Sequence, residues 1–336
     1  KKTLDSFRTQ VEEIKEEGMR QNGFAPVVIC QLTHSGRYAK PEGVPAPLIA
    51  YNNPLFEKEQ PIDKSRIVSD DKLKRLEEAF GATALLAQEA GFDGADIKCC
   101  HRYLLSEMLS AFTRPGDYGG AFENRTRLLR NAIFAAKGAT SGEFLITSRV
   151  NLYDGFAYPY GFGVSPTGGL MPDLTEPKAL VTLLHEELRL PMLDFTIGNP
   201  YVNPHVNRPY DGGPYVPDEH PLEGVARMLG CIGQLKKAFP SLCVIGSGFS
   251  YLRQFSPYLA AGAVEQSVCD LAGFGRMAFA YPDFPRDTLY GEGFNARKTC
   301  IACGKCSALM RAGTVAGCVV RDGETYLPFY QAHCCV

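Results

Sequence analysis

The fold is decided by residues 91–130, GFDGADIKCCHRYLLSEMLSAFTRPGDYGGAFENRTRLLR. The stretch begins with Gly91, which lacks a Cβ and can end a helix in the left-handed conformation. The apolar run 95–100 then predicts a strand buried on both faces, as in a parallel sheet. Four polar side chains follow at its carboxyl end: Lys98, His101, Arg102 and Tyr103. Since parallel α/β folds carry their chemistry at the carboxyl ends of strands, we expect an active site here.

Composition excludes several classes of function. The 336 residues are 45% apolar and 21% charged, so the chain can bury a full core. A formal charge of −2 without a basic block argues against a nucleic-acid partner. No apolar run is long enough to span a membrane, and the charged N-terminus lacks the apolar core of a signal peptide. We therefore expect a cytoplasmic protein.

Strand and helix patterns alternate along the chain. Apolar runs predict six strands, which begin near residues 26, 93, 143, 191, 242 and 268. Helical spacing predicts amphipathic helices over the N-terminus, from Ser69 to Gly91, and over about 122–137 and 222–239. Ser69 is the expected N-cap of the second of these helices. The Pro-rich segment 41–61 is too long for a tight connection and predicts a functional loop or lid.

The strand end and the loop after it resemble the Old Yellow Enzyme family of flavin oxidoreductases. The matching residues are His101, Tyr103, Leu104, Tyr118, Gly119, Gly120, Glu123, Asn124 and Arg125. Two residues depart from the family pattern, because Lys98 replaces a usual His and Arg102 a usual Gly. The resemblance implies a (β/α)8 TIM barrel that binds FMN. It favours the branch of 2,4-dienoyl-CoA reductase and trimethylamine dehydrogenase.

The resemblance also implies which residues hold FMN. Gln31, in the run QLTHSGR, would bind the flavin pyrimidine, because its amide can both donate and accept. Arg149, at the end of the strand near 143, would lie beside the negative charge that appears on flavin reduction. Gly248, Gly275 and Arg276 follow the last two strands, where the family binds phosphate. Without the resemblance, Gln31 is an ordinary strand cap and Arg149 a surface ion-pair partner.

The catalytic assignment follows from the same motif. We expect reduction of an activated C=C bond in an enoate, enone or enoyl thioester, with electrons from NAD(P)H. Tyr103 would protonate the α-carbon, since a phenol with a pKa near 10 is a proton donor at neutral pH. His101 would polarise the substrate oxygen. Lys98 would bind a carboxylate or stabilise reduced flavin.

Twelve cysteines argue for a reducing compartment with a metal cluster. Four of them form C-x2-C-x2-C-x11-C: Cys300, Cys303, Cys306 and Cys318. This spacing favours a [4Fe–4S] cluster over zinc, which more often uses two separated C-x2-C pairs. We expect an FMN-binding domain over 1–290 and a cluster-binding segment over 291–336. In the related branch such a cluster relays electrons to FMN.

Six strand–helix units are two short of a closed barrel. We therefore expect the first two units to be absent from this chain, as part of a longer protein or on another piece. No FAD- or NAD-binding fingerprint follows Cys318, so FAD is expected only on a partner or a missing domain. An electron-donor protein or domain and a homo-oligomer are the expected partners, besides a small-molecule substrate.

Two alternatives remain at the level of sequence. The first is oxidation of an amine, as in trimethylamine dehydrogenase, with an aromatic bowl that binds the cation. Its candidates are Tyr153, Phe156, Tyr158 and Tyr160. The second is a non-catalytic electron-transfer subunit that has the cluster and no open flavin. His205, in an Asn- and Pro-rich loop, is either a substrate contact or a packing residue.

Overall fold

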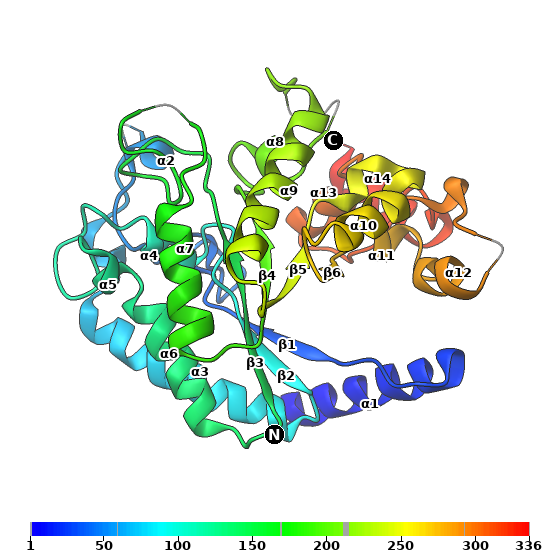
Figure 1. Cartoon of the computed structure of the whole chain (residues 1–336), viewed down its shortest axis with the longest axis horizontal. Coiled ribbons are helices and arrows are strands. Elements are labelled where there is room, and N and C mark those ends of the chain that lie inside the picture. Colours follow the sequence, from blue (N-terminus) through cyan, green and yellow to red (C-terminus); the bar gives the residue numbers. More distant parts are fainter. Residues whose placement is uncertain (1, 59, 169, 211–214, 292, 336) are drawn as a thin grey trace. The chain divides into compact units, whose positions relative to one another are not determined.

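The computed structural model describes residues 2–58, 60–168, 170–210, 215–291 and 293–335 (Figure 1). All six predicted strands are present. They are β1 (Ile29–Leu32), β2 (Gly94–Ile97), β3 (Leu145–Asn151), β4 (Met192–Thr196), β5 (Cys243–Gly246) and β6 (Leu271–Ala272). The chain divides into two compact units. The first is Lys1–Asn203 with Ala238–Val244, and the second is Pro204–Lys237 with Ile245–Val336.

The first unit is a parallel sheet with helices packed on it. Strands β1 to β4 pair in chain order, and the register places Gln31 beside Asp96 and Arg149 beside Asp194. Helices α3 (Asp70–Glu89) and α6 (Arg127–Ala139) pack against each other and against β1, β2 and β3 (Figure 1). Their approach is close, since a Cβ on Gly81 would lie 2.9 Å from the carbonyl oxygen of Ala135.

The predicted helix signals are confirmed in this unit. Ser69 caps α3, because its side chain accepts a hydrogen bond from the backbone N–H of Lys72 at 3.3 Å. Gly91 follows α3 with a φ of 87°. The remaining helical segments are α1 (Lys2–Asn22), η1 (Gly36–Tyr38), α2 (Pro54–Glu57), η2 (Lys64–Arg66), α4 (Leu104–Leu109), α5 (Phe122–Arg125), α7 (Thr175–Val181) and the π-helix η3 (Thr182–Glu187).

The Pro-rich segment 41–61 is anchored by buried charges. Ile49 and Ala50 within it are fully buried. Glu57 pairs with Arg37, and Arg37 also pairs with Glu107 of α4, all three side chains being at most 8% exposed. Because breaking a buried ion pair is costly, this part of the segment is held as packed structure and not as a free lid.

The second unit is mostly helical around a short parallel pair. Strands β5 and β6 pair through Ile245 with Leu271 and Gly246 with Ala272. Its helical segments are α8 (Pro204–Asn207), α9 (Pro221–Ala238), η4 (Phe249–Phe255), α10 (Ser256–Glu265), α11 (Met277–Ala280), α12 (Phe284–Tyr290), η5 (Ala296–Lys298), α13 (Lys305–Arg311) and α14 (Gly323–Cys334). The predicted helix near 222–239 corresponds to α9.

The architecture is a parallel-strand α/β fold whose strands do not close into a barrel within the described residues. Among these residues β1 pairs on one side only, with β2. This agrees with the expectation of six units in place of eight. In the part of the chain that the structure describes, no helix combines the length and the apolar character needed to cross a membrane.

Candidate active site

Two pairs of interacting side chains lie on neighbouring strands of the first unit. One pair is joined by a hydrogen bond and the other by an ion pair. Gln31 on β1 donates from Nε2 to Oδ1 of Asp96 on β2 at 3.1 Å. Arg149 on β3 lies with its Nε 3.1 Å from Oδ2 of Asp194 on β4. Both predicted flavin contacts therefore have an acidic neighbour. Neither acid was among the predicted site residues, although a carboxylate inside the apolar run 95–100 is itself a signal.

Asp96 is the buried member of this group. Burial, with the nearby Asp194 carboxylate, raises the pKa of Asp96 to about 6. The carboxylate is ionised at neutral pH and can then only accept hydrogen bonds. Gln31 must consequently turn its amide N–H toward Asp96. Its carbonyl oxygen and second N–H remain available for another partner.

Tyr103 lies in a cluster of three tyrosines at the strand ends. Its hydroxyl is 3.0 Å from that of Tyr201, and the two rings are nearly parallel at 19°. The ring of Tyr38 stacks on Tyr201 with centroids 4.0 Å apart. Asn199, fully buried, accepts from the backbone N–H of Tyr201 at 2.8 Å and donates to the Tyr38 hydroxyl at 3.4 Å. Tyr38, Asn199 and Tyr201 escaped the sequence analysis because they come from distant loops.

Burial favours the protonated form of the Tyr38 and Tyr103 phenols. It raises the pKa of Tyr38 to about 12, and it raises the pKa of Tyr103 well above its ordinary value. Lys98 lies with Nζ 3.6 Å from the centroid of the Tyr103 ring, a cation–π arrangement. Burial lowers the pKa of Lys98. Lys98 and Tyr103 thus lie side by side in the structure, and their predicted catalytic roles stay predictions.

The turn after β2 has an unusual backbone. His101 and Arg102 both adopt left-handed conformations, with φ values of 64° and 57°. This conformation explains why the family uses glycine at the second position. His101 is half-buried in this turn, next to Tyr103 in the chain. Its predicted contact with a substrate oxygen stays a prediction.

Arg102 is a fully buried cation that the sequence analysis did not explain. Its guanidinium lies 3.0 Å from Oδ2 of Asp154 and donates to the hydroxyl of Tyr51 at 3.2 Å. It also donates to the carbonyl oxygen of Tyr160 at 3.2 Å. The side chain therefore ties the strand end to segment 41–61 and to the loop after β3. These contacts offset the cost of burying the charge and of the left-handed backbone.

The four aromatic residues proposed as a cation-binding bowl pack in different places. Tyr153 is 3% exposed and donates its hydroxyl to the carbonyl oxygen of Leu170. Phe156 packs edge-on against Phe56, with ring centroids 5.1 Å apart. The exposed Tyr158 packs against Phe112, and Tyr160 contributes its backbone carbonyl to Arg102. The side chains of Tyr153, Phe156 and Tyr158 are therefore engaged by other parts of the protein.

The second unit holds the two glycine turns predicted to bind phosphate. The backbone N–H of Gly273 donates to the carbonyl oxygen of Gly246 at 2.7 Å, so the turns after β5 and β6 lie side by side. Gly248 has a φ of 104°, and a Cβ there would lie 2.6 Å from Sδ of Met228. Gly275 has open space around the position of a Cβ. Position 248 favours glycine because its backbone is left-handed and because a Cβ would collide with Met228.

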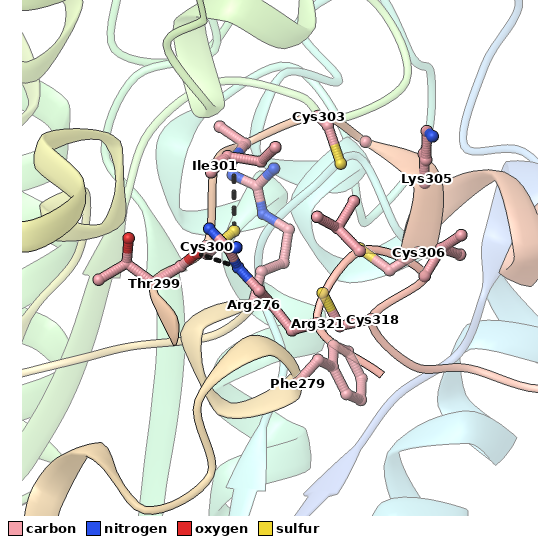
Figure 2. Close-up of a pocket in the computed structure, with 14 residues that line it drawn as sticks. Arg276, Phe279, Thr299, Cys300, Ile301, Cys303, Lys305, Cys306, Cys318 and Arg321 are labelled. Carbon is pink, nitrogen blue, oxygen red and sulfur yellow. Dashed lines mark hydrogen bonds between the residues drawn. The ribbon is translucent and has the colours of Figure 1, made fainter. Parts of the chain in front are cut away.

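The four motif cysteines line one pocket of the second unit. Figure 2 shows the sulfur atoms of Cys300, Cys303, Cys306 and Cys318 around a common space. The donor chemistry fits an iron–sulfur cluster, which thiolates hold. Within the described ranges, however, no three Cys, His, Asp or Glu side chains are close enough together to hold a metal ion. The side chain of Arg276 also lines this pocket, beside the cysteines (Figure 2).

Other candidate residues have structural roles. Cys99 and Cys100 are fully buried, and burial raises the pKa of Cys100 to about 12, so it is a poor nucleophile. His205 Nδ1 lies 2.5 Å from the hydroxyl of Tyr215, and its Nε2 lies 3.8 Å from Glu219. Glu219 in turn pairs with Arg227 at 2.6 Å. These contacts favour loop packing for His205.

Comparisons with known proteins agree with the motif. Residues 1–162 match the model of the NADH:flavin oxidoreductase / NADH oxidase family. An NADPH dehydrogenase of Clostridium acetobutylicum is 33% identical over 158 residues, which cover 46% of this chain and 42% of that protein. An NADPH dehydrogenase of Bacillus subtilis is 33% identical over 147 residues, covering 43% and 39%. The chain thus spans less than half the length of these relatives.

Solved structures share the fold over most of the chain. A 2-naphthoyl-CoA reductase in complex with 2-naphthoyl-CoA superimposes with a TM-score of 0.72 at 19% identity, covering 94% of this chain and 45% of that one. Histamine dehydrogenase of Rhizobium sp. 4-9 gives 0.68 at 21% identity, covering 93% and 41%. The old yellow enzyme homologue of Zymomonas mobilis gives 0.61 at 19% identity, covering 87% and 73%. These likenesses show the predicted barrel-type α/β fold. The predicted resemblance to the Old Yellow Enzyme family is therefore confirmed over residues 1–162, the part of the chain that matches the NADH:flavin oxidoreductase / NADH oxidase family.

Proposed function

We infer that the chain is part of an FMN-dependent oxidoreductase that reduces an activated C=C bond with electrons from NAD(P)H. The observation that carries this function is the position of Tyr103. Its hydroxyl stands at the end of β2, protonated at neutral pH. The predicted flavin contacts, Gln31 and Arg149, lie on the strands to either side. The family match of residues 1–162 includes all three residues.

The residues of the first unit suit the ring of FMN. Asp96 turns the amide of Gln31 so that a carbonyl oxygen and an N–H face a ligand. A flavin pyrimidine offers complementary groups. Asp194 holds the guanidinium of Arg149, a fixed cation for negative charge on that ring. When bound, FMN supplies hydride chemistry. The turns of Gly248 and Gly275 remain the predicted phosphate site.

Side chains at the end of β2 would carry out proton donation, substrate polarisation and substrate binding. Tyr103 gives its proton to the substrate α-carbon while hydride reaches the β-carbon. His101 donates a hydrogen bond to the substrate oxygen and so polarises the double bond. Lys98, beside the Tyr103 ring, favours an enoate or acyl thioester by attraction to negative charge.

The cysteine pocket is the proposed entry point for electrons. Cys300, Cys303, Cys306 and Cys318 would hold a [4Fe–4S] cluster, for which their chemistry and their shared pocket are the support. NAD(P)H would be oxidised by a partner or a further domain carrying FAD. The boundary at residues 290/291, a homo-oligomer and a cytoplasmic location stay predictions.

Anaerobic mixing tests the proposed reaction. Protein reduced with dithionite is mixed with 2-cyclohexenone or crotonyl-CoA while flavin absorbance is followed. We expect the oxidised flavin band to return within a single turnover and the saturated product to form. Reduction of the oxidised protein by trimethylamine, without reoxidation by either alkene, would instead support amine oxidation. Protein free of flavin would support the electron-transfer subunit.

The variant Lys98→Met tests the substrate class. We expect the rate with crotonyl-CoA to fall relative to that with cyclohexenone, because the variant removes the cation beside the Tyr103 ring. An unchanged ratio, together with an unchanged flavin potential, would remove Lys98 from the proposal.

A further inference from the structure

We propose that Tyr201 is a proton-relay residue, which returns a proton to Tyr103 after each turnover. The proposal rests on the function inferred above, in which Tyr103 gives its proton to the substrate. It concerns a side chain from the loop after β4, outside the catalytic motif of residues 98–103.

The first support is the geometry of the two hydroxyl groups. They lie 3.0 Å apart, and either can donate. Tyr103 is half-buried, whereas Tyr201 is 43% exposed. A hydrogen-bonded pair with one half-buried and one exposed member connects the reacting proton to solvent.

The second support is that the protein fixes Tyr201 from two sides. Its backbone N–H donates to the side chain of Asn199, which is fully buried. Its ring stacks on Tyr38 at 4.0 Å. Since Asn199 also holds the Tyr38 hydroxyl, one buried amide positions both aromatic neighbours. An exposed tyrosine held in this way keeps its hydroxyl directed at Tyr103.

The proton balance is simple. The O–H bond of Tyr103 breaks as a C–H bond forms at the substrate α-carbon. The Tyr103 oxygen then takes the proton of the Tyr201 hydroxyl, and the Tyr201 oxygen takes a proton from water. Both electrons added to the substrate arrive with the hydride of reduced FMN, so the relay moves protons only.

The surroundings favour this order of events. Lys98 Nζ lies 3.6 Å from the centre of the Tyr103 ring, where a cation stabilises the transient phenolate. The other titratable groups that act on Tyr103 are Tyr38 and Cys100. Both stay neutral at physiological pH, because burial raises the pKa of each to about 12.

The variant Tyr201→Phe separates a relay from a positioning role, because it keeps the ring stacked on Tyr38. The first turnover of reduced protein uses the proton already on Tyr103, so its rate should be unchanged. Steady-state turnover needs a new proton each cycle and should fall roughly tenfold or more, toward the size of other general-acid effects. The solvent deuterium isotope effect on the steady-state rate should rise. Tyr158→Phe removes a hydroxyl from a tyrosine that packs against Phe112 outside this cluster, so it is the matched control and should change neither rate.

Each other outcome has a definite meaning. Equal loss of both rates would show that Tyr201 only positions Tyr103. No loss of either rate would show that water can return the proton to Tyr103 directly. Either result overturns the relay and leaves the proposed function standing. A wild-type protein that reduces no alkene would overturn the proposed function and the relay together. If Tyr201→Phe does not fold, 3,5-difluorotyrosine at position 201 keeps the hydroxyl with a lower pKa. The alkaline limb of the steady-state pH profile should then move to lower pH, and an unmoved limb contradicts the relay.

Discussion

The strand-end site of the first unit and the cysteine pocket of the second unit are built differently. At the strand ends, side chains proposed to bind flavin or to act in catalysis have partners from another strand or loop, as in Gln31 with Asp96 and Tyr103 with Tyr201. In the pocket, four cysteines from short connections line one space. Over the described parts of the chain they do not reach the spacing of metal ligands.

This difference shows what fixes the geometry of each site. Backbone pairing of β1 with β2, β2 with β3 and β3 with β4 fixes the strand-end residues, and neighbouring side chains fix their side chains. The cysteine segment has one seven-residue helix, α13, which begins at Lys305 and carries the third cysteine, Cys306. Since metal binding and local folding are coupled at such sites, the pocket is expected to take its final form around its ligand. The strand-end site should be preorganised.

The largest expected effect concerns the cysteine pocket. Cys303→Ser removes one of four thiolates, and we expect most of the bound iron to be lost, because a serine hydroxyl is a poor replacement for a thiolate. Iron and acid-labile sulfide per chain are measured after anaerobic purification. Cys30→Ser, on β1 and outside the motif, is the control and should keep the wild-type iron content. Full iron in Cys303→Ser would remove the cluster from this pocket.

The next effect tests the strand-end site. Tyr103→Phe should slow alkene reduction by about 10²–10⁴-fold, the usual contribution of a general acid. Flavin content should not change, because the ring and its contacts remain. Tyr158→Phe, a tyrosine packed against Phe112, is the matched control. Equal rates in Tyr103→Phe and wild type would move the proton donor elsewhere.

A third variant tests whether the buried Arg102–Asp154 ion pair stabilises the structure at the strand end. Arg102→Met leaves Asp154 buried without its cation, which should lower the free energy of unfolding by about 3–5 kcal/mol. Urea unfolding followed by circular dichroism measures the change. The double variant Arg102→Met with Asp154→Asn should recover part of the loss. A double variant as unstable as the sum of both single variants would show that the two groups do not interact.

The smallest effect is a dependence on pH. The folded-state pKa of Asp96, about 6, exceeds its ordinary value of 3.8, so the folded state binds the proton more tightly. The contribution of Asp96 to stability is therefore highest below pH 4 and falls as pH rises through 6, by about 1.4 kcal/mol per pKa unit. Asp96→Asn should abolish this fall in urea unfolding at pH 4 and pH 7. In Asp63, hydrogen bonds from Ser65 lower the pKa, so Asp63→Asn should change the pH dependence in the opposite sense. A wild-type slope in Asp96→Asn would contradict the pKa shift.

The sequence alone was sufficient to predict the helices and strands and to single out the residues of the motif. Apolar runs and the Ser69 cap are local signals, and the structure confirms the strands and the start of α3 that they predicted. The partners of the motif residues are not local. Tyr38 and Asn199 lie 161 residues apart, and Arg102 meets Asp154 across 52 residues. Pairings of this kind depend on the register of the sheet and on loop paths, which no short pattern encodes.

The aromatic residues suggested as a cation-binding bowl show the same limit. Phe156 and Tyr158 stand close together in the sequence and suggested a bowl, but they pack against Phe56 and Phe112 respectively. An aromatic cluster does exist, at Tyr38, Tyr103 and Tyr201. Its members come from three separate connections, so composition alone could not identify it.

The most direct test of the proposed function is an anaerobic absorbance spectrum of the purified protein, combined with iron and sulfide assays. We expect a flavin band together with about four irons per chain, the stoichiometry of a cubane. That result would support a preorganised flavin site and a cysteine pocket that folds around its cluster. A spectrum with neither flavin nor iron, from protein that is folded by circular dichroism, would contradict both.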